Sequence, residues 1–235
     1  MKVALVTGAT GGIGRFLVDG LIGMGYHVVG VGRSEAKLRD VTESDNFSYI
    51  VADLREPGAP MRVLEEFQNM GFQRLGLLVN NAGFAIRKPL LEHDSDELRD
   101  VFQVNTVAPV DLTVKFTPVM PQGSTVVFVI SGVAFINVPE LPSYCSAKGA
   151  LHYLAVNLER ELKDREINVM RVYPQHVRTG FWGEKVPKGA VEPEKVARVI
   201  LNGLKTGRRE VFVPSYMRIV EYLPNWPVFT YRFKY

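Results

Sequence analysis

The chain has 235 residues, of which 46% are hydrophobic and 23% are charged, a balance typical of a globular protein with a sizeable core. Its net charge is only +3 and its basic residues are interspersed with acidic ones, so we expect no nucleic-acid partner. The single cysteine, Cys145, excludes an intrachain disulfide, and neither a signal peptide nor an apolar run of membrane-spanning length precedes or interrupts the pattern, so we expect a cytoplasmic protein.

Short apolar runs alternate with longer helical patterns along the chain. The strands are expected at Val3–Thr7, His27–Gly32, Tyr49–Ala52, Leu77–Asn80, Thr125–Ser131, Ile167–Tyr173 and Glu210–Pro214. The helices are expected near Ile13–Met24, Glu35–Asp40, Pro60–Met70, Ser95–Val119, Ser143–Glu166 and Pro193–Lys205. This alternation predicts an α/β fold, a doubly wound, Rossmann-like parallel sheet of about seven strands with helices on both faces. We expect one domain over residues 1–235, with ligands at the carboxyl ends of the strands.

A glycine-rich turn, Thr7-Gly8-Ala9-Thr10-Gly11-Gly12-Ile13-Gly14, follows the first strand and opens the first helix. Glycines let the backbone turn tightly and approach a pyrophosphate, and the helix N-terminus adds amide donors and partial positive charge. A tight turn without a ligand would explain the same letters. The position between a strand and a helix favours a dinucleotide site.

The segment Tyr144-Cys145-Ser146-Ala147-Lys148 places a phenol and an amine four residues apart, which is the same face of a helix. A nearby ammonium is expected to lower the pKa of the phenol, so that Tyr144 can give and take a proton near neutral pH. Ser131 stands at the end of an expected strand, where its hydroxyl would hold a substrate oxygen. Cys145 points away from Tyr144 on the helix and is expected to be a packing residue.

These motifs, with Asn80-Asn81-Ala82-Gly83 and Asn105, resemble the compact, single-domain branch of the short-chain dehydrogenase/reductase family. The resemblance implies that Tyr144 is the general acid/base and that Lys148 binds the nicotinamide ribose and lowers the phenol's pKa. It also implies that Ser131 bonds the substrate oxygen and that Asn105 anchors a water in a proton relay. The expected cofactor-binding residues are Gly8, Thr10, Gly11, Gly12, Ile13, Gly14, Arg33, Ser34, Asp53, Leu54, Asn81, Ala82, Gly83, Tyr144, Lys148, Pro174, Val177 and Thr179.

The end of the second strand favours NADP(H) over NAD(H). An acidic residue here would bind the adenosine ribose and repel a 2′-phosphate, but the chain has Arg33 and Ser34 instead. Arg33 offers a planar fork of donors suited to a phosphate. Ser34 also suits a helix N-cap, which is compatible with that role. Asp53 resembles the family's adenine-contacting aspartate, and a simple turn residue is nearly as good an explanation.

The segment Pro174 to Thr179 resembles a family segment that holds the nicotinamide carboxamide, but Gln175 stands where glycine is usual. If that position needs a positive φ, Gln175 would be strained and the loop path would change. His176 beside it is expected to contribute shape or a hydrogen bond. The other histidines show no clustering with acids or cysteine, so we propose no metal.

Residues 180–192 contain three glycines and two adjacent aromatic residues, Phe181 and Trp182. This segment is expected to form a substrate lid or a plain surface loop. Phe84, Phe135 and Trp182 are expected to be apolar pocket walls. The tail from Pro214 to Tyr235 is rich in aromatics. Its residues Tyr216, Ile219, Val220 and Leu223 follow a helical spacing, and this stripe is expected to cover a subunit contact in a dimer or tetramer. Contact with a membrane is the minority interpretation.

The sequence therefore predicts an NADP(H)-dependent oxidoreductase that interconverts a small ketone or aldehyde, most simply an apolar one, with its alcohol. Asn105, Ser131, Tyr144 and Lys148 form the expected catalytic set. Two alternatives stay open: a non-catalytic dinucleotide-binding redox sensor or scaffold, and an epimerase or dehydratase on the same fold.

Overall fold

A computed structural model describes residues 2–222 of the chain. Seven parallel strands form one sheet, as the strand pattern predicts, and their order in the sheet is β3-β2-β1-β4-β5-β6-β7. The strands are β1 (Lys2–Thr7), β2 (Tyr26–Gly32), β3 (Phe47–Val51), β4 (Leu77–Asn80), β5 (Thr125–Val129), β6 (Asn168–Pro174) and β7 (Glu210–Val213). The inner strands are apolar along nearly their whole length because both faces of the sheet are covered.

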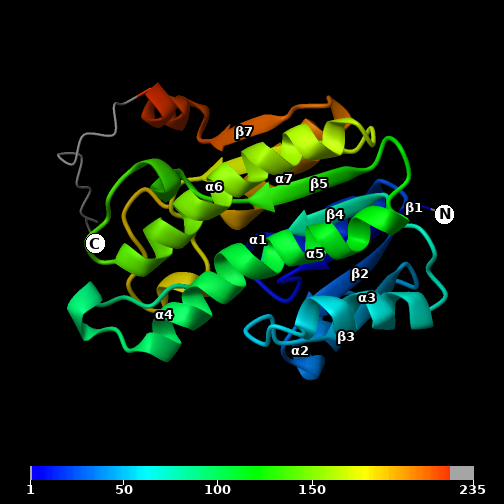
Figure 1. The fold of residues 1–235 in the computed structure, drawn as a ribbon, viewed down its shortest axis with the longest axis horizontal. Helices are drawn as coiled ribbons and strands as arrows, with labels where there is room; N and C mark the ends of the chain where they lie inside the picture. Colours follow the sequence, from blue (N-terminus) through cyan, green and yellow to red (C-terminus); the bar gives the residue numbers. More distant parts are fainter. Residues whose placement is uncertain (1, 223–235) are drawn as a thin grey trace.

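Helices pack on both faces, and Figure 1 shows α4, α5 and α6 crossing one of them. The α-helices are α1 (Gly12–Gly23), α2 (Glu35–Arg39), α3 (Ala59–Asn69), α4 (Ser95–Phe102), α5 (Ala108–Phe116), α6 (Pro142–Lys163) and α7 (Pro193–Lys205). Phe67 of α3, Phe116 of α5 and Leu151 of α6 share one core with the sheet. Leu17 of α1 and Ile200 of α7 lie in the core on the other face.

The helix expected over Ser95–Val119 is present as a continuous helical run, but its middle is a π-helix, η2 (Gln103–Val107). Two residues explain the wider turn. The side-chain amide of Asn105 donates to the Val101 carbonyl at 2.9 Å, which is the oxygen that its backbone N–H would bond in an α-helix. Pro109 has no N–H to donate to the carbonyl of Asn105.

Short 3₁₀ turns connect the remaining elements. They are η1 (Leu90–Glu92), η3 (Thr117–Val119), η4 (Gly132–Phe135), η5 (Gly180–Trp182) and η6 (Ser215–Tyr222). The tail begins with helical structure as expected, but η6 is a 3₁₀-helix rather than an α-helix. Tyr216 and Ile219 of the expected stripe are 66% and 64% exposed, whereas Met217 packs on the core. Leu223 and the aromatic residues that follow Tyr222 lie outside the described residues.

The order of the strands positions the site. From β1 the chain winds outward through β2 and β3, then returns to place β4 on the other side of β1. The loops after β1 and β4 therefore diverge at the carboxyl edge of the sheet and leave a crevice between them. Of the helices within residues 2–222, none has the length and apolar character needed to cross a bilayer.

Candidate active site

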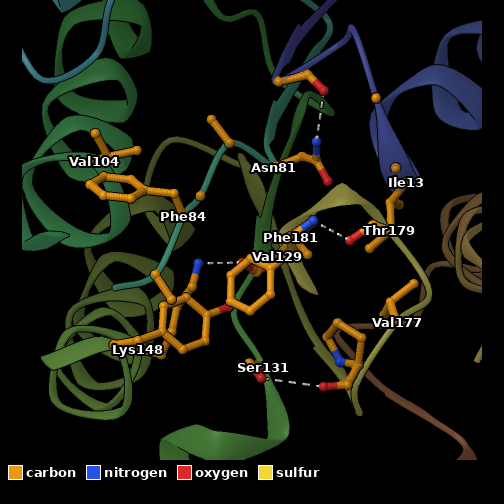
Figure 2. A pocket seen from close by; sticks show the side chains of 18 of the residues that line it. Ile13, Asn81, Phe84, Val104, Val129, Ser131, Lys148, Val177, Thr179 and Phe181 are labelled. Carbon is orange, nitrogen blue, oxygen red and sulfur yellow. Dashed lines mark hydrogen bonds between the residues drawn. The ribbon is translucent and has the colours of Figure 1, made fainter. Parts of the chain in front are cut away.

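A cavity of about 830 Å³ opens at this carboxyl edge. The loops that follow β1, β2, β3, β4, β5 and β6 all contribute to its lining. Figure 2 shows Asn81, Lys148, Ser131 and Thr179 arranged around it. Of the expected site residues, Gly14, Ser34 and Asn105 lie off the lining, and the others contribute to it.

Glycines shape the turn after β1. Gly8 and Gly12 have φ values of +67° and +53°, which side chains rarely adopt. A Cβ on Gly14 would stand 2.1 Å from the carbonyl oxygen of Gly8, so only glycine lets α1 pack this closely on the turn. Around Gly11 there is open space, and it faces the cavity.

The turn is tied to the segment after β4. The Thr7 hydroxyl accepts hydrogen bonds from the backbone N–H groups of Asn81 and Ala82, each at 3.0 Å, and donates to Val79. The Asn81 amide returns a bond to the Thr7 carbonyl at 2.9 Å. These hydrogen bonds join the glycine turn to the segment after β4 where β1 and β4 end side by side.

Helix α6 carries Tyr144 and Lys148 to the cavity wall, and Ser131 reaches it just after β5. The Lys148 ammonium lies 5.6 Å from the centre of the Tyr144 ring and donates to the Val129 carbonyl at 3.0 Å. The Ser131 hydroxyl donates to the Pro174 carbonyl at 3.4 Å, as Figure 2 shows. The phenol and the amine of α6 therefore converge with the hydroxyl of the segment after β5.

The expected lowering of the phenol's pKa is not found. Burial raises the pKa of Tyr144 above its ordinary value, Cys145 adds to the rise, and a hydrogen bond with Ser131 opposes it. Burial also lowers the pKa of Lys148 to about 7, so its positive charge is itself disfavoured here. The helix spacing was right about proximity, but desolvation of both groups outweighs their attraction.

Asn105 is fully buried behind this wall. Its amide nitrogen donates to the Phe84 and Val101 carbonyls at 2.8 and 2.9 Å, while its Oδ1 has no hydrogen-bond partner among the described residues. A Cβ on Gly83 would stand 2.7 Å from that Oδ1 and 3.5 Å from the Lys148 nitrogen. Gly83 therefore lies between the buried Asn105 and the cavity, close to the Lys148 nitrogen, and a larger residue would not fit there.

Three charged side chains lie at the other end of the cavity. Asp53 pairs with Arg55 at 2.5 Å, and this hydrogen bond holds the pKa of Asp53 below its ordinary value. Arg33 is exposed on the cavity rim and makes no ion pair with a described carboxylate. Ser34 caps α2 by accepting from the Lys37 N–H. Sequence reasoning missed Arg55, although its position directly after Asp53-Leu54 was a usable signal.

The loop after β6 forms the far wall. Gln175 lines the cavity without a positive φ, so the expected strain is absent. Thr179 contacts the glycine turn, since its Cγ2 would be 2.9 Å from a Cβ on Gly12. The Nε2 of His176 lies 3.2 Å from the Lys188 carbonyl, and burial lowers the pKa of His176.

Aromatic residues cover Tyr144. Phe181 lies 5.2 Å from it, ring to ring, and Trp182 is buried with its indole N–H bonded to the Val177 carbonyl at 2.9 Å. Phe84 and Trp182 line the cavity as expected. Phe135 does not, because the η4 turn directs it into the core, where its ring contacts Tyr173.

Cys145 is partly buried, and burial raises the pKa of its thiol to about 11, which keeps it protonated and unreactive. Within residues 2–222, no three His, Cys, Asp or Glu side chains are grouped in a way that would hold a metal ion.

A model of the family described as short chain dehydrogenase matches residues 2–189, most of the chain. The chain belongs to this family. Among its relatives, an uncharacterized oxidoreductase, DltE, of Bacillus subtilis is 32% identical over 222 residues, covering 89% of this chain and 87% of the relative. An NADPH-dependent 3-dehydrocapnine reductase of Ornithobacterium rhinotracheale is 30% identical over 194 residues, covering 78% and 68%.

Solved short-chain dehydrogenase structures share the fold. One from Burkholderia phymatum in complex with NAD has a TM-score of 0.84 at 20% identity, covering 94% of this chain and 92% of that one. An alcohol dehydrogenase from the archaeon Thermococcus sibiricus complexed with 5-hydroxy-NADP has a TM-score of 0.81 at 23% identity, covering 90% and 95%. The protein is therefore a short-chain dehydrogenase by sequence and by fold, and the choice between NAD and NADP rests on its own residues.

Proposed function

We propose that this short-chain dehydrogenase is an NADP(H)-dependent oxidoreductase that interconverts a ketone or aldehyde with its alcohol. The observation that carries the proposal is the convergence of Tyr144, Ser131 and Lys148 on one cavity whose opposite end holds the glycine turn and Arg33. Bound NADP(H) would supply the hydride that is exchanged with the substrate carbon.

The residues present suit such a cofactor. The open space at Gly11 lets a pyrophosphate approach the N-terminus of α1. Arg33 forms no ion pair with a described carboxylate, although its charge helps to lower the pKa of Asp53, and it lies on the lining where it would meet a 2′-phosphate. Arg55 adds a second cation on the lining. Asn81, Gly83, Lys148 and Thr179 would hold the nicotinamide end.

Tyr144 would donate a proton to the substrate oxygen as negative charge develops there, while the Ser131 hydroxyl holds that oxygen in place. Tyr144 is protonated at neutral pH, so it holds the proton that the reductive direction would consume. The unpartnered Oδ1 of Asn105 would accept a hydrogen bond from a relay water that passes a proton toward Lys148.

Replacement of the phenol tests the proposal. Tyr144→Phe should bind NADPH as the wild type does, measured by cofactor fluorescence, and should lose at least about 100-fold in carbonyl reduction, the contribution typical of a general acid. Tyr153→Phe is the matched control, because Tyr153 lies on the same helix and is 62% exposed. Unchanged turnover in Tyr144→Phe would exclude the mechanism. NADPH binding without net oxidation of cofactor by any carbonyl compound would favour a sensor or an epimerase.

The remaining features are also proposals. We take residues 1–235 as one catalytic unit in the cytoplasm, with residues 180–192 as the substrate cover. Exposed apolar side chains on α5 and α6, such as Val114 and Leu154, support assembly into a dimer or tetramer. Light scattering on the purified protein tests that assembly.

A further inference from the structure

Gln175 occupies the cavity wall directly after Pro174, whose carbonyl accepts the Ser131 hydroxyl. Its backbone N–H donates to the Val213 carbonyl at 2.8 Å, which continues the β6–β7 pairing by one residue. The backbone of Gln175 is therefore held by the sheet, one residue after the Pro174 carbonyl that accepts the Ser131 hydroxyl.

The carboxamide of Gln175 has two neighbours. The Tyr216 hydroxyl of η6 donates to its Oε1 at 3.2 Å, and its Nε2 lies 3.5 Å from the Nε2 of His176. That histidine nitrogen also lies 3.2 Å from the Lys188 carbonyl, which can only accept, so it carries a hydrogen and cannot accept one from Gln175.

An amide has two N–H groups, and Tyr216 engages only one end of it. At least one N–H of Gln175 is thus left without an acceptor among the described residues, on a side chain that faces the cavity. Met217 of η6 also lines the cavity, and its Cε would be 3.1 Å from a Cβ on Gly132, so η6 packs against the cavity wall beside the Tyr216 bond.

Apolar side chains form much of the cavity lining. They include Phe84, Val133, Ile136, Leu141, Phe181 and Met217. A lone, oriented donor in an apolar wall selects ligands that carry an acceptor at the matching place. The basic groups on this part of the lining are Lys148 and His176, and burial disfavours the positive charge of both, so a neutral acceptor fits better than an anionic one.

We propose that Gln175 donates a hydrogen bond to a second, neutral oxygen of the substrate. The preferred substrates are then carbonyl compounds with an apolar body and a further ester, keto or amide oxygen. This specificity rests on the proposed oxidoreductase function for the reaction itself. It follows from the glutamine that stands here in place of the family's usual glycine, which offers no side-chain donor.

Binding measured without turnover tests the donor directly. Ethyl β-hydroxybutyrate and its ether analogue, in which a methylene replaces the ester carbonyl, are titrated into the protein with NADPH, a pairing of product and reduced cofactor that does not react. Ethyl 4-hydroxypentanoate, the alcohol related to ethyl levulinate, and its ether analogue repeat the test with one more methylene between the hydroxyl and the ester. We expect at least one ester to bind about five- to tenfold more tightly than its ether, the usual effect of one neutral hydrogen bond.

Three variants separate a substrate contact from a structural role. Gln175→Leu and Gln175→Glu should bring the ester-to-ether ratio to about one, since neither side chain donates. Tyr216→Phe, which removes the bond from η6 but keeps the amide, should retain a ratio above that of Gln175→Leu. Equal binding of ester and ether by the wild type at both spacings, or an unchanged ratio in Gln175→Leu, would overturn the inference. Reduction of ethyl acetoacetate and ethyl levulinate with NADPH is measured in parallel, so that failure of turnover counts against the proposed function alone.

Discussion

Arg33 offers the sharpest test of cofactor choice, because its guanidinium forms no ion pair with a described carboxylate, while Asp53 pairs with Arg55 at 2.5 Å. Arg33→Ala should weaken NADPH binding and leave NADH binding within about twofold. A hydrogen bond to a charged group contributes about 1.5–3 kcal/mol. Because Arg33 is exposed and Arg55 remains nearby, we take the lower end, which corresponds to about a tenfold loss in affinity for NADPH.

Titration of each reduced cofactor by its fluorescence enhancement measures both affinities on one protein preparation. Arg39→Ala is the matched control, because Arg39 is also exposed but pairs with Glu35 at 2.6 Å and lies off the cavity. The NADPH loss should shrink as ionic strength rises, since exposed charge pairs are screened. Equal losses for NADPH and NADH, or no loss for NADPH, would show that Arg33 does not read the 2′-phosphate.

Three further changes probe packing and charge. Gly14→Ala should lower the free energy of unfolding by about 1–3 kcal/mol in urea melts, because the new methyl would meet the Gly8 carbonyl at 2.1 Å. Lys148→Met should flatten the pH dependence of stability. With a folded pKa of about 7 against an ordinary 10.5, the unfolded wild type binds more protons, so its stability rises between about pH 7 and 10 by up to about 1.4 kcal/mol per pH unit, whereas the variant lacks this rise. Arg171→Met should cost about 2–3 kcal/mol, because it strands the half-buried Glu159 carboxylate that Arg171 binds at 2.6 Å.

Each of these changes has its own check. Gly23→Ala, in the same helix with open space around it, should be neutral or stabilising, so a similar loss there would refute the packing argument for Gly14. Parallel pH profiles for the wild type and Lys148→Met would show that the amine is not desolvated. Full stability of Arg171→Met would show that its ion pairs are solvated.

Much of the fold was predictable because both faces of the sheet are covered. Buried parallel strands are continuously apolar and stand out from amphipathic helices, and Leu77–Asn80 and Pro193–Lys205 were placed to the residue. The π turn at Asn105 was not visible, because it depends on one side-chain hydrogen bond to Val101 that a hydrophobic pattern does not record.

The site was predictable in its membership and less so in its energetics. Spacing alone put Tyr144 beside Lys148, but their pKa values depend on how deeply the folded chain buries both. Phe135 packs on the core and Met217 lines the cavity because of the direction in which short 3₁₀ turns point their side chains. The hydrophobic pattern over so few residues does not predict that direction. Gln175 was noticed as a departure, yet its partner Tyr216 lies in a segment far away in the sequence.

The π-helix η2 between α4 and α5 changes the direction in which the side chains of α5 point relative to those of α4. One extra residue in a helical turn rotates everything beyond it by about 100°, relative to an uninterrupted α-helix. The half before Gln103 can thereby present its apolar side to α6 while the half after Val107 faces α3. A single-residue deletion within Gln103–Val107 would restore regular winding and turn one of these two halves away from its neighbour.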